Sequence, residues 1–152
     1  MINYVKRRVK KAHLMPGTAI YTGTKEKKST DIKLIKYNKD EYKEEIINDI
    51  STIQSKLEKN KINWIEIKSA VNEESIKKLC QIFNIHRLVV EDILNTSQTP
   101  NIRNFLDYYY IVLNKISKEK DNVEQISFIY KNNILISFQE SSEDIFFPVK
   151  DR

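Results

Sequence analysis

Apolar and polar residues alternate along short stretches of the first half of the chain, and this period of two predicts β-strands. From Ile32 to Tyr37, isoleucine and leucine fall on one side, while isoleucine and tyrosine fall on the other. That stretch predicts a strand that is partly buried on both faces. From Ile62 to Ile67 the alternation repeats, with β-branched residues on one side and Trp64 on the other, and it predicts a second strand.

One long stretch carries apolar residues at the spacing of an α-helix. Between Glu41 and Lys59 the apolar positions step by four, four, three and four from Tyr42 to Leu57. This spacing places them on one face of a helix. The stretch therefore predicts an amphipathic helix, and Asp40 is a suitable N-cap for it.

Two shorter helices are predicted further along the chain. Asn72 is a suitable N-cap, and the two glutamates after it stand in the first turn, where the helix dipole favours negative charge. The apolar stripe that follows predicts a helix that stops at Asn84. A second helix is expected from His86 to Leu94. Its expected buried residues are Leu88, Val89, Val90 and Ile93.

The second half of the chain predicts an antiparallel meander. Three stretches are rich in β-branched and aromatic residues: Tyr108 to Ile116, Val123 to Tyr130 and Ile134 to Gln139. Pro100 ends the element that precedes it. The two asparagines after Lys131 supply a turn that tolerates left-handed geometry. Helices in the first half and a meander in the second predict an α/β sandwich with a mixed sheet.

The composition fits one soluble globular domain. The chain has 152 residues, of which 40% are hydrophobic and 31% are charged, and this is enough for a real core. Its longest apolar runs, such as Tyr108 to Leu113, are far shorter than the roughly 20 residues of a membrane-spanning helix. No apolar segment of a signal peptide follows the N-terminus. A single cysteine, Cys80, excludes an internal disulfide and favours a reducing, cytoplasmic setting.

A net charge of +5 and the basic cluster from Lys6 to Lys11 are typical of nucleic-acid-binding proteins. Elsewhere lysines alternate with acids, as between Asp40 and Lys59, which is typical of a solvated surface. We therefore expect residues 1–15 to form a flexible basic arm and expect no nucleic acid as a partner. Attraction of the arm to anionic lipid headgroups is a third interpretation.

The scattered histidines and the cysteine do not predict an enzyme. His13, His86 and Cys80 are too few and too widely spaced for a structural zinc site. We expect His86 to cap or pack at the start of its helix, and Cys80 to lie in the core rather than act as a nucleophile. The chain has two glycines, too few for a glycine-rich phosphate loop.

The adjacent acids Glu91 and Asp92 interrupt the apolar stripe of the helix from His86 to Leu94. Neighbours in a helix project about 100° apart, so the two carboxylates contribute to two different binding surfaces, or one of them contributes to none. A hard cation such as Mg²⁺ keeps most of its water and needs only one or two protein carboxylates, so Asp92 alone is a sufficient contribution. The alternative is a pair of solvated acids on a surface helix.

This acidic helix belongs to an ordered series of short motifs. The series runs Pro16-Gly17-Thr18, Tyr21-Thr22-Gly23, His86 to Asn95, Gln98 with Pro100, Glu124 to Phe128, and Phe138-Gln139-Glu140. In this order and rough spacing the motifs resemble the cytoplasmic N-terminal domain of the CorA family of divalent-cation transporters. The resemblance implies one domain over residues 16–152, an α/β/α sandwich with helices packed on both faces of the mixed sheet.

The resemblance also implies a part in magnesium and cobalt transport at the cytoplasmic face of the cell membrane. In this family the matching acids lie between the subunits of a pentamer, where divalent ions bind and favour closure of the channel. Asp92 is then the principal ligand of a regulatory Mg²⁺ and Glu91 a secondary one, each facing an acid of the neighbouring subunit. The family's long stalk helix, membrane segments and pore signature do not occur before Arg152. We therefore expect an excised domain that binds Mg²⁺ weakly and reaches the membrane only through the missing C-terminal part.

Two departures from the family pattern are present. Gln98-Thr99-Pro100-Asn101 stands where many members have a more basic sequence, and the loss of positive charge is expected to help nearby acids hold a divalent ion. Ser69-Ala70 stands where aspartate or glycine is frequent. Zinc-transporting relatives share the fold, so zinc transport is one alternative function, and a small basic nucleic-acid-binding module is another.

Overall fold

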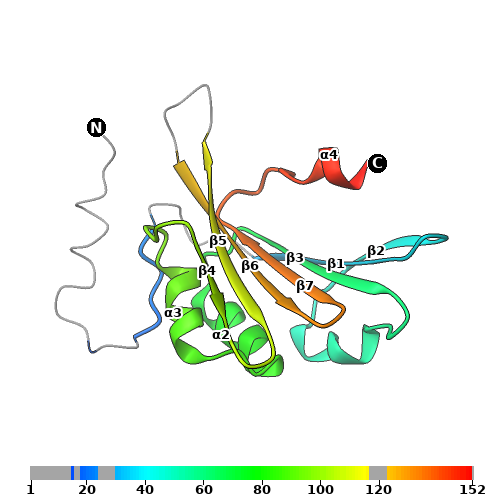
Figure 1. Ribbon diagram of the computed structural model, residues 1–152, viewed down its shortest axis with the longest axis horizontal. Helices are drawn as coiled ribbons and strands as arrows, with labels where there is room; N and C mark the ends of the chain where they lie inside the picture. Colours follow the sequence, from blue (N-terminus) through cyan, green and yellow to red (C-terminus); the bar gives the residue numbers. More distant parts are fainter. Residues whose placement is uncertain (1–14, 16–17, 24–29, 117–122, 152) are drawn as a thin grey trace.

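The computed structural model describes residues 15, 18–23, 30–116 and 123–151. Within them a seven-stranded mixed sheet forms (Figure 1). Its strands are β1 (Asp31–Tyr37), β2 (Tyr42–Ile46), β3 (Ile62–Lys68), β4 (Asn101–Asn104), β5 (Tyr109–Ile116), β6 (Val123–Lys131) and β7 (Ile134–Gln139). Their order across the sheet is β2-β1-β3-β7-β6-β5-β4. Neighbours in the described sheet pair antiparallel, except that β3 runs parallel to β7.

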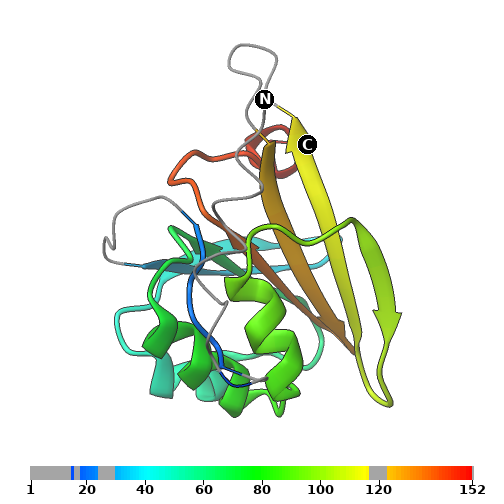
Figure 2. The same cartoon turned by 90° about the vertical axis from the view of Figure 1, so that its left-hand side faces the viewer.

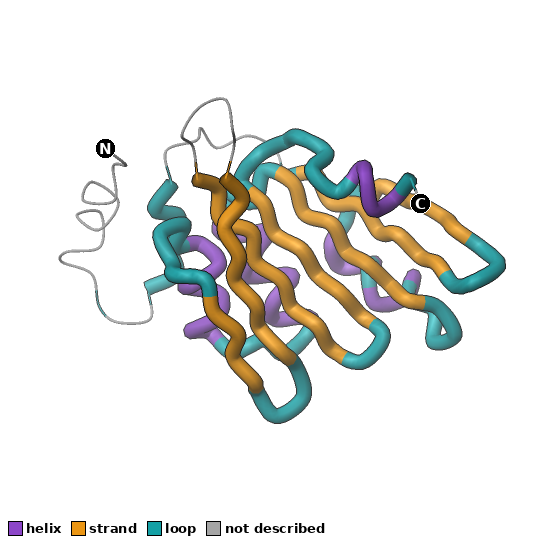
Figure 3. The backbone as a smooth tube through the Cα atoms, turned by 45° about the horizontal axis from the view of Figure 1, so that its top comes forward, coloured by secondary structure: helices purple, strands orange, loops and turns teal. Residues whose placement is uncertain are grey.

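Helices lie on both faces of this sheet (Figure 3). One face is covered by α2 (Glu73–Ile82) and α3 (Arg87–Leu94), with two 3₁₀ turns at Ile50–Thr52 and Gln54–Lys56. The other face carries the short helix α4 (Phe147–Lys150). The predicted α/β/α fold with a mixed sheet is therefore confirmed. Across the described residues, no helix has both the length and the apolar character that crossing a membrane requires.

The main core fills the space between the sheet and the helices α2 and α3. Alternate strand residues point into it, such as Leu34, Ile65 and Ile136, which are at most 1% exposed. Leu79 and Cys80 meet them from α2. Burial raises the pKa of the Cys80 thiol to about 12, so the side chain stays neutral and behaves as a small apolar residue. Its predicted place in the core is confirmed.

The C-terminal segment covers the middle of the opposite sheet face. The Phe146 ring packs edge-on against Trp64 of β3 and Phe128 of β6, with centroid separations of 5.2 and 5.8 Å. Beside these rings, Lys150 Nζ lies 3.1 Å from both carboxylate oxygens of Glu66. The Glu66 side chain is fully buried and that of Lys150 is 6% exposed. A buried ion pair and an aromatic cluster therefore hold α4 to the sheet.

Most of the predicted elements are confirmed. β1, β3, β5, β6 and β7 match the five predicted strands to within one residue at each end. α2 begins after Asn72, whose side chain accepts a hydrogen bond from Ser75 N, and the predicted left-handed turn is present at Asn132, with a φ of 53°. α3 follows His86 as expected, but Leu88 is 46% exposed rather than buried, because this position faces away from the sheet.

The predicted helix between Glu41 and Lys59 is wrong. Tyr42–Ile46 forms β2, which pairs with β1 after a turn held by the Asn38 side chain, and Asp40 lies in that turn and caps no helix. The ladder with β1 satisfies backbone groups that a helix would have satisfied internally. Asp49 then caps a 3₁₀ turn, because its side chain accepts a hydrogen bond from the backbone N of Ser51. The helical spacing thus joined residues of β2 with residues in and beside the two 3₁₀ turns.

Two predicted features fall outside the described residues. The basic arm, residues 1–15, is described only at Met15, which is 80% exposed. The Pro16-Gly17 motif falls outside them as well. The division into an arm and a domain that begins at residue 16 therefore stays a prediction.

Candidate functional site

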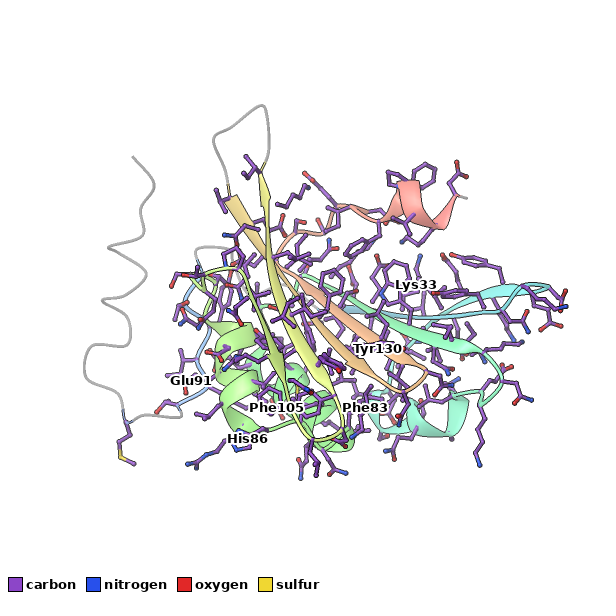
Figure 4. All side chains as sticks on the ribbon, viewed as in Figure 1. Lys33, Phe83, His86, Glu91, Phe105 and Tyr130 are labelled. Atoms are coloured by element: carbon purple, nitrogen blue, oxygen red, sulfur yellow. The ribbon has the colours of Figure 1, made fainter. Side chains whose placement is uncertain are left out.

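The candidate site lies where α3 faces the edge of the sheet at β4. His86 Nδ1 accepts a hydrogen bond of 3.2 Å from the backbone N of Leu88, and this caps the helix. The His86 ring also stacks on Phe105, with the centroids 6.4 Å apart (Figure 4). The predicted capping and packing role of His86 is confirmed. It fixes the start of the helix that carries Glu91 and Asp92.

Glu91 and Asp92 point to different surfaces, as helix geometry predicts. Glu91 lies on the side of α3 that is away from β4 and β5 (Figure 4). Asp92 faces β4, and its side chain is 19% exposed. The N-terminal segment 18–23 runs beside α3 (Figure 2), where Thr22 N donates a hydrogen bond of 3.0 Å to the carbonyl oxygen of Leu94.

Both oxygens of the Asp92 carboxylate accept hydrogen bonds from the same chain. Arg103 Nη2 donates to Oδ2 and forms an ion pair with it, and Gln98 Nε2 donates to Oδ1 at 2.7 Å. The expected loss of positive charge therefore does not leave Asp92 without a cation. The sequence from Gln98 to Asn101 carries no cation, but Arg103 on β4 returns one to the same carboxylate.

A second glutamine ties the end of α3 to the sheet. Gln125 of β6 is 5% exposed. Its Oε1 accepts a hydrogen bond of 2.9 Å from Gln98 N, and its Nε2 donates one of 3.2 Å to the carbonyl oxygen of Asp92. Buried side-chain amides are usually hydrogen-bonded. Through these two hydrogen bonds Gln125 fixes the loop that presents Gln98 to the carboxylate.

Aromatic rings hold Arg103 in place. Its guanidinium carbon lies 5.0 Å from the ring centroid of Tyr110 and 5.9 Å from that of Phe105, within the range of a cation–π contact. Tyr110 is fully buried, and this desolvation raises the pKa of its hydroxyl. Arg103 Nε is buried and has no hydrogen-bond partner among the described residues, although the side chain as a whole is 40% exposed.

The donor chemistry suits a hard divalent cation, but the described residues do not gather a full set of ligands. The described residues contain no group of three or more histidine, cysteine, aspartate or glutamate side chains that could hold a metal. Mg²⁺ binds through one or two carboxylates and water, so Asp92 and Glu91 are each suitable single ligands. Since they face different surfaces, Glu91 and Asp92 do not converge on one ion within the described residues.

Reasoning from the sequence missed Arg103, and it placed Gln125 in a motif without assigning it a contact. A signal for Arg103 was present, because polar Asn101 and Arg103 alternate with Ile102 directly after Pro100, as in a short edge strand. Its pairing with Asp92 depends on how β4 joins the sheet, and local spacing does not show that.

Residues 59–151 match the family of CorA-like Mg²⁺ transporter proteins. The match spans more than half of the chain, so the chain belongs to this family. Over 151 residues it is 33% identical to the cobalt/magnesium transport protein CorA of Thermotoga maritima. That similarity covers 97% of this chain and 43% of the relative, so the chain spans less than half of the relative's length.

Two solved structures share the fold. The CorA magnesium transporter from Methanocaldococcus jannaschii matches with a TM-score of 0.55 and 18% identity, over 78% of this chain and 35% of that one. The ZntB cytoplasmic domain from Vibrio parahaemolyticus matches with a TM-score of 0.59 and 13% identity, over 82% of this chain and 49% of that one. At these identities the likeness shows the fold alone.

Proposed function

We propose that this chain is the cytoplasmic, metal-sensing regulatory domain of a CorA-like magnesium ion transporter. The observation that carries the proposal is the 33% identity to a cobalt/magnesium transport protein over 97% of the chain. The ions in that relative's name favour magnesium and cobalt over zinc as the transported ions. Since this chain spans 43% of the relative, we place the stalk and transmembrane helices in the remaining part of the full-length protein.

In this proposal Asp92 is the principal regulatory ligand and Glu91 a secondary one. Their carboxylates leave α3 in two directions, so each can face a different surface of a neighbouring subunit. We propose a pentamer in which an acid of the next subunit completes each site. Bound Mg²⁺ neutralises acids that otherwise repel one another across the interface. With the acids neutralised, the subunits pack closely, and this arrangement favours the closed channel.

Ion uptake by the full-length transporter tests the proposal. Asp92→Ala should weaken the inhibition of uptake by cytoplasmic Mg²⁺, and Glu91→Ala should act in the same direction but less strongly. If the lost carboxylate contributes about 1.4 kcal/mol to binding, the half-inhibitory concentration rises about tenfold. Basal uptake should persist, because neither residue belongs to the pore in this proposal.

Asp107→Ala is the matched control. Asp107 is also an acid paired with a cation, with 2.7 Å to Lys131 Nζ, but it is 54% exposed and lies in the turn between β4 and β5. Its removal should leave the inhibition unchanged. Unchanged inhibition in Asp92→Ala and Glu91→Ala as well would remove both acids from the regulatory site.

A further inference from the structure

We propose that Arg103 is an internal counter-cation that occupies the Asp92 carboxylate and sets the divalent-cation concentration needed to bind there. The inference rests on the proposed function, because it assigns a regulation to the same carboxylate. It concerns a residue of this chain that neither the family match nor the acidic motif singles out. The competition between Arg103 and a divalent ion follows from three features of the site.

The first feature is that each oxygen of the carboxylate already accepts a hydrogen bond from this chain. Arg103 Nη2 takes Oδ2, and Gln98 Nε2 takes Oδ1 at 2.7 Å. A divalent ion needs an oxygen at about 2.0–2.6 Å, and Arg103 needs the same oxygen for its charge-assisted hydrogen bond. Two cations at one carboxylate also repel each other. Binding of a divalent ion through Oδ2 therefore competes with Arg103.

The second feature is that Arg103 is held in its paired position. The Tyr110 and Phe105 rings lie 5.0 and 5.9 Å from the guanidinium carbon, and Tyr110 is itself fully buried. Phe105 stacks on Tyr108 at a centroid separation of 4.6 Å, so neither ring is free to follow the guanidinium. This support distinguishes the pair from an ion pair of two mobile surface side chains, which loses more conformational entropy when it forms.

The third feature is that Arg103 can leave without disturbing the core. It lies on β4, the edge strand of the described sheet, and its side chain is 40% exposed. Its buried Nε has no hydrogen-bond partner among the described residues, so moving into water satisfies a donor that the paired position leaves unsatisfied. The Arg103–Asp92 ion pair is therefore stable enough to compete with a divalent ion and weak enough to dissociate.

The size of the effect follows from the population of the open carboxylate. For a partly exposed ion pair of this kind, the state in which Arg103 pairs with Asp92 is favoured about fivefold over the state in which they are apart. The apparent Kd for a divalent ion rises by about the same factor. Arg103→Ala should therefore tighten Mg²⁺ binding by about fivefold. Arg103→Gln removes the charge but keeps most of the stem over Tyr110, and it should act in the same direction.

The test is a titration of the 152-residue chain with MgCl₂ at constant ionic strength, followed by the backbone amide NMR signals of residues 91–98. Wild type, Arg103→Ala and Arg103→Gln are compared with Lys43→Ala. That control removes one positive charge from an exposed position on β2, at the opposite edge of the described sheet from β4. We expect tighter binding in both Arg103 variants and wild-type binding in Lys43→Ala. A variant is used only if its spectrum matches wild type away from the site, and Arg103→Gln serves if Arg103→Ala does not fold.

Adding Asp92→Ala to the Arg103 variant separates this inference from the proposed function. If the double variant loses the binding that the single variant gained, both stand. If the Arg103 variants bind no more tightly than wild type, yet Asp92→Ala abolishes the wild-type response, Arg103 is not a competitor and the role of Asp92 stands. If Asp92→Ala changes binding in neither background, Asp92 is not a ligand and the proposed site itself is overturned.

Discussion

Replacing Lys150 by methionine should loosen α4 from the sheet. Lys150 Nζ lies 3.1 Å from both oxygens of Glu66 and 2.7 Å from Asp144 Oδ1. Burial opposes its charge, but the hydrogen bonds with Asp144 and Glu66 outweigh this and raise the pKa of Lys150. Methionine keeps the length and apolar stem of the side chain and removes the ammonium group. The change therefore leaves the fully buried carboxylate of Glu66 without its nearest cation.

The expected loss is about 2 kcal/mol in the free energy of unfolding. Removing one partner of a buried ion pair costs about 3–5 kcal/mol when the other charge stays buried and unpaired. Two features reduce that cost here. Lys68 Nζ remains 3.9 Å from Glu66 Oε2 and is 15% exposed, and α4 is short enough to lift and admit water. Lifting α4 also separates Phe146 from Trp64, so part of the cost reappears as lost aromatic packing.

Trp64 reports both effects, because it is the single tryptophan of the chain and is 6% exposed. Urea unfolding followed by its fluorescence gives the stability, and a red shift of the native emission reports the lifting of α4. Lys115→Met is the control. Lys115 pairs with Glu143 at 3.1 Å, but the two side chains are 33% and 75% exposed, so its loss should cost less than about 1 kcal/mol.

Adding Glu66→Gln to Lys150→Met should recover part of the loss, because the uncompensated charge is then gone. The reasoning fails if Lys150→Met unfolds at the wild-type midpoint with unchanged native emission. It also fails if the double variant is less stable than Lys150→Met by the full cost of Glu66→Gln alone, because the two side chains then do not interact.

Two further predictions concern other charged and reactive groups. The hydrogen bonds from Lys36 and then Lys61 lower the pKa of Glu58 from 4.5 to about 2; a lowered folded-state pKa gives stability above the unfolded pKa that is lost as the pH falls. Thermal unfolding should therefore show wild type losing stability between pH 4.5 and 2, with a shallower loss in Glu58→Gln, and equal slopes would exclude this ion pair as a cause. Cys80 should not react with a thiol reagent at pH 8 until the chain unfolds, because it is fully buried and its pKa is raised to about 12. Colour development with Ellman's reagent, with and without urea, checks this, and rapid reaction of the native chain would contradict it.

Local patterns predicted the elements whose residues decide their own structure. The strands β1 and β3 follow from alternation, and Asn72 marks the start of α2 because its side chain satisfies a backbone N–H within the same turn. β2 was missed because its apolar residues Tyr42 and Ile46 are 52% and 71% exposed, so they do not mark a buried face of a strand. Only pairing with β1, which no spacing within β2 records, makes this segment a strand.

The candidate site was predictable to the same extent. Helix geometry alone separates Glu91 from Asp92, and the structure places them on two surfaces. The partners of Asp92 come from elsewhere in the chain: Arg103 of the edge strand β4 pairs with its carboxylate, and Gln125 of β6 donates a hydrogen bond to its carbonyl oxygen. These contacts depend on the register of β4 and β6 in the sheet. The acids were therefore visible in the sequence, and the pairing of Asp92 with Arg103 was not.

The parallel pairing of β3 with β7 has a consequence for synthesis on the ribosome. Asn63 pairs with Ile134 and Ile67 with Phe138, a wider separation in sequence than in the β1–β3 pair, where Asp31 meets Lys68, or in the other described strand pairs. A nascent chain can form the β1–β2 hairpin early, but one edge of β3 and the apolar faces of α2 and α3 stay uncovered until β7 has left the exit tunnel. Contacts of such long sequence separation also form slowly. During that interval the growing chain exposes apolar side chains and an unpaired strand edge, and these are the surfaces that chaperones bind.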